Sequence, residues 1–207
     1  MTTALVTAAQ LGFGFASAPA LFTDLNFVIP TAGVTLIQGG ESRGKSTLLR
    51  LLTGQLQPGS GQLRMHGQDM HAPLLANQIY AHEPRQERWH EQTPRQFWAQ
   101  LAAQYPHWDE AAAEAMLQHL QLAEHSDKAM YMLSTGSKRK VGWVAALACG
   151  AELLLMDEPF AALDLASIRK LQQLLGDWPA QHRSAWVLAD YQAPGTVPLA
   201  ALIDLGD

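Results

Sequence analysis

The sequence predicts an α/β fold with a mainly parallel β-sheet, an N-terminal antiparallel β portion and an inserted α-helical subdomain. Strand-like and helical runs alternate along most of the 207 residues, as in a parallel sheet covered by helices. A glycine-rich loop at 39–47 joins a strand-like run to a helical run, and strong helix formers fill the middle of the chain. We therefore expect one domain over 1–207, with a core of about 1–82 and 151–207 and a helical subdomain of about 83–150.

The N-terminal stretch is apolar and ends in Ala-Ser-Ala-Pro-Ala, which resembles a signal-peptide cleavage site. Its first three residues carry no basic side chain, and Gly12 and Gly14 interrupt the apolar run, so we expect a strand and not a signal. The expected strands, in chain order, are Ala4–Thr7, Leu21–Ile29, Val34–Ile37, Gln62–His66, Asn77–Ala81, Glu152–Met156, Ser184–Ala189 and Ala200–Leu205.

Helices are expected where leucines recur at helical spacing or where strong helix formers follow a proline. Residues 83–92 are polar and read as a connector before the helical block. The expected helices are Lys45–Leu52, Arg95–Gln104, Asp109–Leu122, Lys138–Cys149 and Leu165–Leu175.

Composition narrows the classes of function. The net charge of −5 disfavours a general nucleic-acid binder, which usually carries a basic excess. Only 16% of residues are charged, against a typical share of about 25%, so we expect a partner to cover part of the surface. The single Cys149 excludes an internal disulfide and a cysteine-cluster metal site. The uncharged run Val141–Ala151 is shorter than the about 18–20 residues that span a bilayer, so we expect a soluble chain.

The loop at 39–47 carries the strongest functional signal. Gly39, Gly44, Lys45 and Ser46 fill the fixed places of the pattern G-x-x-x-x-G-K-[ST], with a strand-like run before it and a helix after it. Such a P-loop presents backbone N–H groups to phosphate, while the lysine neutralises the β- and γ-phosphates and the serine hydroxyl holds Mg²⁺. A chance glycine-rich turn is the alternative. The predicted nucleotide-binding residues of this loop are Gly39, Gly40, Glu41, Ser42, Arg43, Gly44, Lys45, Ser46 and Thr47.

Asp157 and Glu158 follow the apolar run Leu153–Met156, at the strand end where parallel sheets place their ligands. Phosphoryl transfer needs one carboxylate for the metal and a second to orient the attacking water. Asp157 suits the first role, and Glu158 is the predicted catalytic base beside Lys45. An acidic turn that closes a strand is the structural alternative.

The segment Leu133–Val141 reads as a helix start, in which Ser134 or Ser137 can cap and Gly136 permits a tight turn. Its three adjacent cations oppose the helix macrodipole at an N-terminus, which an incoming anion would explain.

Together, the P-loop, Leu133-Ser134-x-Gly136, Leu153–Pro159 and Ala161–Asp164 resemble the nucleotide-binding subunit of ATP-binding cassette (ABC) ATPases over nearly the whole chain. The resemblance implies that Ser134, Thr135 and Gly136 form a signature loop that contacts the γ-phosphate held by a second protomer. It implies that Leu163 and Asp164 form a D-loop at the dimer interface. It also implies that Phe15, or less favourably Phe13, stacks on adenine.

The sequence departs from the family pattern at three places. Thr135 and Ser137 replace the usual glycine and glutamine of the signature. His82 or Glu83 stands where a glutamine is expected, and His82 is a predicted metal ligand acting through a water. Asp190 stands where the family carries a histidine that touches the γ-phosphate, and it is the predicted switch position.

The resemblance implies an ATPase that binds ATP and Mg²⁺, pairs as a homodimer or as a heterodimer with another ABC subunit, and powers a separate transmembrane permease of the export type. It implies a cytoplasmic protein on the inner face of the cell membrane, with no direct nucleic-acid contact. Three alternatives stay open: a soluble ABC ATPase acting on a protein-assembly complex, a P-loop kinase for a small molecule, and a slow ATP-binding switch.

Overall fold

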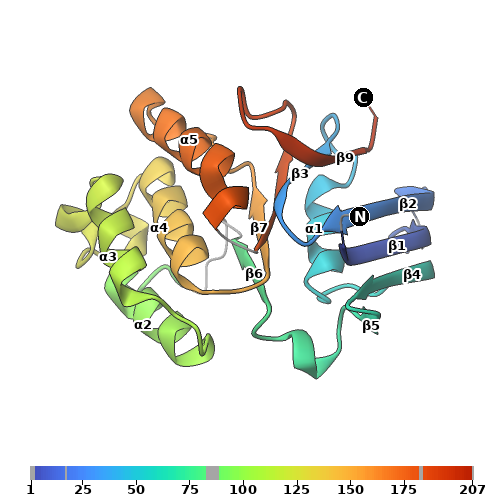
Figure 1. Ribbon diagram of the computed structural model, residues 1–207, viewed down its shortest axis with the longest axis horizontal. Coiled ribbons are helices and arrows are strands. Elements are labelled where there is room, and N and C mark those ends of the chain that lie inside the picture. Colours follow the sequence, from blue (N-terminus) through green and yellow to red (C-terminus); the bar gives the residue numbers. More distant parts are fainter. Residues whose placement is uncertain (1–2, 17, 83–88, 182–183, 207) are drawn as a thin grey trace.

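The computed structural model of the protein describes residues 3–16, 18–82, 89–181 and 184–206. Its described strands form two sheets, one of four strands in the order β2-β1-β4-β5 and one of five strands in the order β6-β7-β8-β3-β9. Pairs in the first sheet are antiparallel, and pairs in the second are parallel. The predicted α/β fold, with a parallel sheet and an N-terminal antiparallel portion, is confirmed (Figure 1).

The parallel sheet forms the centre of the molecule. Its three inner strands are buried at nearly every position, because helices cover both faces and so require apolar side chains on both. Their carboxyl ends lie at one edge, where Gln38 is paired with Asp190 and Asp157 with Ala189. The strands of this sheet are β3 (Gly33–Gln38), β6 (Ile79–His82), β7 (Leu153–Asp157), β8 (Ala185–Asp190) and β9 (Leu199–Asp204).

The antiparallel sheet lies at the end of the molecule that is away from α2 and α3, and it packs on helix α1 (Figure 1). The apolar N-terminal stretch forms its strand β1, whose buried residues join one cluster with those of α1. Strand β5 was not predicted; it has two residues and follows a turn in which His66 and Gly67 both have positive φ. The strands are β1 (Ala4–Phe13), β2 (Phe22–Pro30), β4 (Ser60–Met65) and β5 (Gln68–Asp69).

Side chains cap the first turns of α2, α3 and α4. Thr93 forms a capping box with Gln96 at α2, and Asp109 caps α3. The predicted start of α4 at Lys138 is wrong, because Ser134 accepts a hydrogen bond from the Ser137 amide and starts the helix at Thr135. The helices are α1 (Lys45–Leu52), α2 (Pro94–Gln104), α3 (Glu110–His119), α4 (Thr135–Ala148) and α5 (Leu165–Gln181), with short 3₁₀ turns η1 (Pro73–Leu75), η3 (Ala123–His125) and η4 (Met130–Met132).

Tryptophans join the helical block to the central sheet. Trp143 of α4 and Trp186 of β8 are fully buried, with ring centroids 5.1 Å apart. The Trp143 indole also donates a hydrogen bond to the carbonyl of Pro159. Side chains of α2, α3 and α4 therefore share one hydrophobic cluster with the sheet.

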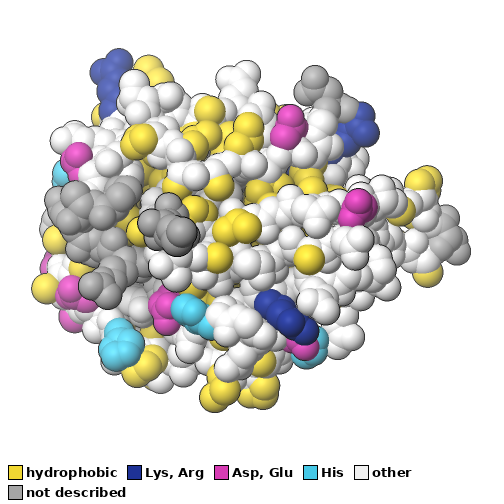
Figure 2. All heavy atoms as spheres, turned by 45° about the vertical axis from the view of Figure 1, so that its right-hand side comes forward, with side chains coloured by type: hydrophobic (Ala, Val, Ile, Leu, Met, Phe, Trp, Pro, Cys, Tyr) yellow, Lys and Arg dark blue, Asp and Glu magenta, His cyan; other side chains and the backbone are white. Residues whose placement is uncertain are grey.

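Figure 2 shows lysine and arginine side chains few and separate on the face that it draws, with apolar side chains exposed among uncharged ones. Within the described residues, no helix combines the length and the apolar character needed to cross a membrane.

Candidate functional site

The glycine-rich loop links the end of β3 to the first residue of α1. Gly44 has φ +93°, and a Cβ there would lie 2.7 Å from the Phe22 ring, so backbone conformation and space both require glycine. Gly44 also provides no side-chain cap to the helix. The first backbone N–H groups of α1 are therefore presented in the way that binds phosphate.

Lys45 is buried at the base of this loop, with 7% of its surface exposed. Its Nζ donates hydrogen bonds of 2.7 Å to the carbonyl oxygens of Gly39 and Gly40. The same ammonium lies 3.9 Å from the ring centroid of Tyr191, within cation–π range. Backbone dipoles and an aromatic face thus hold the lysine charge in place.

Ser46 and Asp157 meet at the sheet edge. The Ser46 hydroxyl donates a 2.6 Å hydrogen bond to Oδ2 of Asp157, although 111 positions separate the two residues. A hydroxyl and a carboxylate oxygen are hard donors of the kind that Mg²⁺ prefers, with its other positions left to water and phosphate. Two of the three predicted metal-binding residues, Ser46 and Asp157, therefore lie together, and their chemistry fits the ion.

A cavity of about 310 Å³ opens above these residues. Phe15 and Tyr191 lie on its wall with the acidic pair, whereas Phe13 packs edge-on against Phe15 at 5.1 Å. Of the two phenylalanines considered for stacking, Phe15 is therefore the one that lines the cavity, and 46% of its surface is exposed. The cavity is lined by Phe15, Leu21, Ser42, Arg43, Gly44, Lys45, Ser46, Thr47, Asp157, Glu158 and Tyr191.

Asp190 is half-buried beside this cavity. Its Oδ1 accepts a 2.7 Å hydrogen bond from the backbone N–H of Tyr191. Burial raises the pKa of the carboxyl group, and the nearby carboxylates of Glu158 and Asp157 raise it further, against the effects of the Tyr191 N–H and Lys45. The Asp190 carboxylate therefore caps its own turn, and it also lies close enough to Asp157 and Glu158 to feel their negative charge.

The predicted signature residues lie at the N-terminus of α4, outside the cavity lining. Ser134 is the N-cap, and Ser134 and Thr135 are exposed. Gly136 lies so close to the carbonyl of Ala162 that no Cβ fits between them. The predicted signature loop and the predicted D-loop are thus packed together within one chain.

A second contact joins the same two loops. Lys140 donates a 2.8 Å hydrogen bond to Asp164 Oδ2, and Asp164 Oδ1 accepts one of 2.8 Å from the amide of Ser167. The Lys140 bond, followed by those from Ser167, lowers the pKa of Asp164 well below its usual range. Leu163 beside it is half-buried against the main core cluster.

His82, a predicted metal ligand, packs its ring against Gly142 of α4. It is not part of the cavity lining. Glu83, the other residue considered for this role, lies outside the described residues.

Two further residues at the site were not singled out from the sequence. Arg139 of α4 contacts Glu158 through both its Nε and its Nη2. Arg139 and Lys140 pair with acidic residues of the same chain, which explains two of the three cations at this helix start without a bound anion. The second residue is Tyr191. Its aromatic side chain directly after Asp190 was the signal in the sequence that could have identified it.

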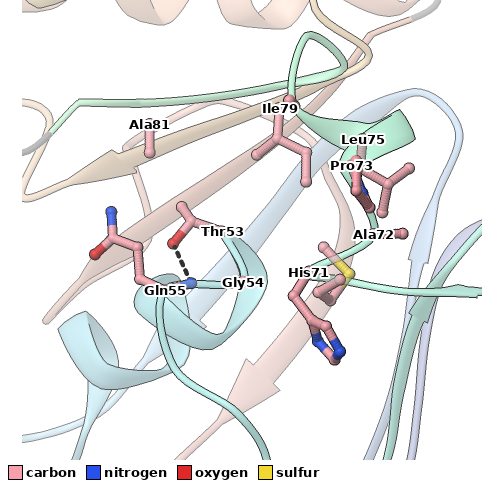
Figure 3. A pocket seen from close by; sticks show the side chains of 11 residues that line it. Thr53, Gly54, Gln55, His71, Ala72, Pro73, Leu75, Ile79 and Ala81 are labelled. Atoms are coloured by element: carbon pink, nitrogen blue, oxygen red, sulfur yellow. Dashed lines mark hydrogen bonds between the residues drawn. The ribbon is translucent and has the colours of Figure 1, made fainter.

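A second cavity, of about 330 Å³, lies at the opposite end of α1 from the phosphate loop (Figure 3). Thr53, Gly54 and Gln55 form one wall, and Ile79 and Ala81 of β6 form another. The rest of its lining is Met70, His71, Ala72, Pro73, Leu75 and Ala76. This lining carries no acidic side chain.

A family model and two similar proteins all point to the same family. A family model described as ABC transporter matches residues 22–161. The cytochrome c biogenesis ATP-binding export protein CcmA of Paramagnetospirillum magneticum is 34% identical, over 86% of this chain and 86% of that protein. The taurine import ATP-binding protein TauB of Pseudomonas savastanoi pv. phaseolicola is 31% identical, over 77% of this chain but 61% of that protein.

Solved structures agree on the fold. An ABC transporter ATP-binding protein from Pyrococcus furiosus superposes with a TM-score of 0.78 over 97% of this chain and 96% of that one. Its sequence identity is 18%, so this likeness speaks for the fold alone.

Proposed function

This chain belongs to the ABC transporter family as an ATP-binding, ATP-hydrolysing subunit, and we propose that it powers a separate transmembrane permease of the export type. The observation that carries the proposal is the meeting of Lys45, Ser46 and the Asp157–Glu158 pair in one cavity. The likeness to CcmA over 86% of both chains, against 61% of TauB, supports the export direction.

Nucleotide binding follows from the cavity walls. The adenine stacks on Phe15, and the phosphates lie on the N–H groups at the start of α1. Lys45 turns its ammonium from the carbonyls of Gly39 and Gly40 toward the β- and γ-phosphates. The exposed Glu41, Ser42 and Arg43 and the half-buried Thr47 would complete the loop around them.

Ser46 and Asp157 would hold Mg²⁺, which when bound neutralises phosphate charge. Glu158 lines the same cavity, and in this proposal it would orient or deprotonate the attacking water. His82 would join the metal shell through a water only after its ring leaves Gly142.

A second protomer completes the site in this proposal, either an identical chain or another ABC subunit. The exposed Ser134 and Thr135, with Gly136, are the surface that would reach the γ-phosphate of that protomer. Leu163 and Asp164 would lie at the same interface, since Gly136 and Lys140 fix them beside α4.

The permease would contact the second cavity. Helix α1 starts at the phosphate loop and ends about 12 Å away at this cavity, so a side chain bound in the cavity would be coupled to the nucleotide site through α1. Leu74, which is 72% exposed, stands beside it as an apolar contact. Such a partnership would place the subunit on the cytoplasmic face of a membrane.

One observation favours slow hydrolysis. Asp190 lacks the hydrogen-bond donor that a histidine would offer, and it adds negative charge beside Glu158 and Asp157. A slow ATP-binding switch is therefore the second candidate function. A third candidate is an ATPase that acts on a soluble protein-assembly complex. Its partner would be a soluble protein and not a membrane permease.

Co-purification decides between these partners. The tagged chain should retain a multi-span membrane protein, and that complex should hydrolyse ATP faster than the chain alone. Ala76→Arg should remove this stimulation and keep basal ATPase activity, because Ala76 is exposed in the second cavity. Ala111→Arg, on the exposed side of α3, is the matched control. Retention of soluble assembly factors alone would contradict the permease.

A further inference from the structure

Arg139 is one of the few charged side chains buried among the described residues, with 5% of its surface exposed. Its Nη2 lies 3.2 Å from Oε2 of Glu158, and its Nε donates a 2.8 Å hydrogen bond to the Glu158 carbonyl oxygen. The guanidinium therefore holds both the backbone and the carboxylate of a single residue. A buried cation that loses its partner is strongly destabilised, so this pairing is not incidental to the fold.

Glu158 is also held from its other side. Its φ of +45° is unusual for a residue with a side chain, and its amide donates a 2.9 Å hydrogen bond to the carbonyl of Ala189. The carboxylate alone keeps rotational freedom, at the rim of the cavity and 31% exposed. Its orientation therefore depends on the one cation that contacts it among the described residues.

The helix that carries Arg139 also carries the signature residues. Ser134 caps α4 five positions before Arg139, and Gly136 packs under Ala162. Helix α4 is rigid here, because Trp98 and Tyr80 donate hydrogen bonds to its carbonyl oxygens. Helix α4, which carries Arg139, is thus also the helix that would face a second protomer.

We propose that Arg139 is a positioning residue that fixes the carboxylate of Glu158 toward the attacking water and makes its orientation depend on α4. The inference rests on the proposed function, in which Glu158 acts on that water. Arg139 takes up no proton and touches no substrate. The planar guanidinium of arginine suits this task better than the ammonium of lysine, because it can donate hydrogen bonds to a carbonyl and a carboxylate oxygen at the same time.

The test compares Arg139→Met, Arg139→Lys and the wild-type chain in steady-state ATPase assays with Mg²⁺-ATP. We expect kcat to fall about 10- to 100-fold in Arg139→Met, since small misplacements of a reacting group carry penalties of this size. Arg139→Lys should recover part of the loss. The Kd for ATP should stay within about 2-fold of the wild type, because Arg139 lies outside the cavity lining. Arg95→Gln, which removes an exposed cation paired with Asp127, is the control for lost charge alone.

The split between kcat and ATP affinity separates positioning from mere support of the fold. Loss of the fold would weaken ATP binding together with kcat, whereas loss of positioning lowers kcat alone. Wild-type kcat in Arg139→Met would overturn the inference. If Arg139→Met does not fold, Arg139→Lys decides: reduced kcat with unchanged ATP affinity supports the inference, and wild-type kcat overturns it. Full activity of Glu158→Gln would instead show that the proposed role of Glu158 has failed.

Discussion

The packing of His82 on Gly142 predicts an unusual response to a single added methyl group. A Cβ at Gly142 would lie 2.3 Å from Cγ and Nδ1 of His82 and 2.4 Å from Cδ2. The ring would have to retreat by roughly 1 Å to reach ordinary contact distance. We expect Gly142→Ala to lower the free energy of unfolding by about 1–3 kcal/mol, the usual cost of overpacking. At a helix position with free space around it, the same substitution would instead raise the free energy of unfolding by about 0.5–1 kcal/mol.

A double-mutant cycle isolates this contact. In a His82→Ala background, Gly142→Ala should become stabilising by about 0.5–1 kcal/mol, since only the helix preference remains. The coupling energy should then be about 1.5–4 kcal/mol. Gly176→Ala in α5 is the matched control, because the nearest atom to its added Cβ is Pro198 Cδ at 4.0 Å. Urea unfolding followed by circular dichroism gives all four values. If Gly142→Ala stabilises the wild-type chain as Gly176→Ala does, His82 does not pack on α4 and the reasoning is refuted.

Four other substitutions test the nucleotide site and the surface that would complete it. Lys45→Ala should weaken ATP binding by about 10- to 100-fold in isothermal titration calorimetry, because hydrogen bonds to a charged group contribute about 1.5–3 kcal/mol; unchanged affinity would contradict its phosphate role. Ser134→Arg should block ATP-dependent dimer formation in size-exclusion chromatography while single-chain binding persists, and loss of that binding would indicate a misfolded loop instead. Asp190→His should raise kcat by up to about 100-fold through a restored donor, and an unchanged rate would remove Asp190 from the chemistry. Because the raised pKa of Asp190 makes its ionisation costly, Asp190→Asn should gain stability relative to the wild type as pH rises above about 4, and a gap independent of pH would argue against this.

Local signals in the sequence identified the parts of the fold that local chemistry controls. Helix α1 begins and ends where leucine spacing placed it, at Lys45 and Leu52. The apolar run before Asp157 is the buried strand β7, because a strand covered on both faces needs no alternation. The start of α4 was misplaced at Lys138, although Ser134 was one of the two caps that the sequence offered, and Ser134 is the cap.

Contacts between distant segments could not be predicted in the same way. Residue type alone does not show that Arg139 pairs with Glu158, or that His82 needs a glycine at 142. Both contacts depend on how α4 lies across the sheet, which Trp143 and Trp186 fix by packing. The position of Tyr191 over Lys45 likewise follows from the parallel register of β3 and β8.

The central claim is that Glu158 acts on the water that attacks ATP bound at Lys45 and Ser46, between two protomers. Glu158→Gln tests it most directly, because the amide cannot accept the proton while its shape is kept. Mg²⁺-ATP turnover and dimer formation are measured on the same preparation. We expect ATP to bind with wild-type affinity, hydrolysis to stop, and a stable ATP-dependent dimer to elute in size-exclusion chromatography. Hydrolysis at the wild-type rate by this variant would contradict it.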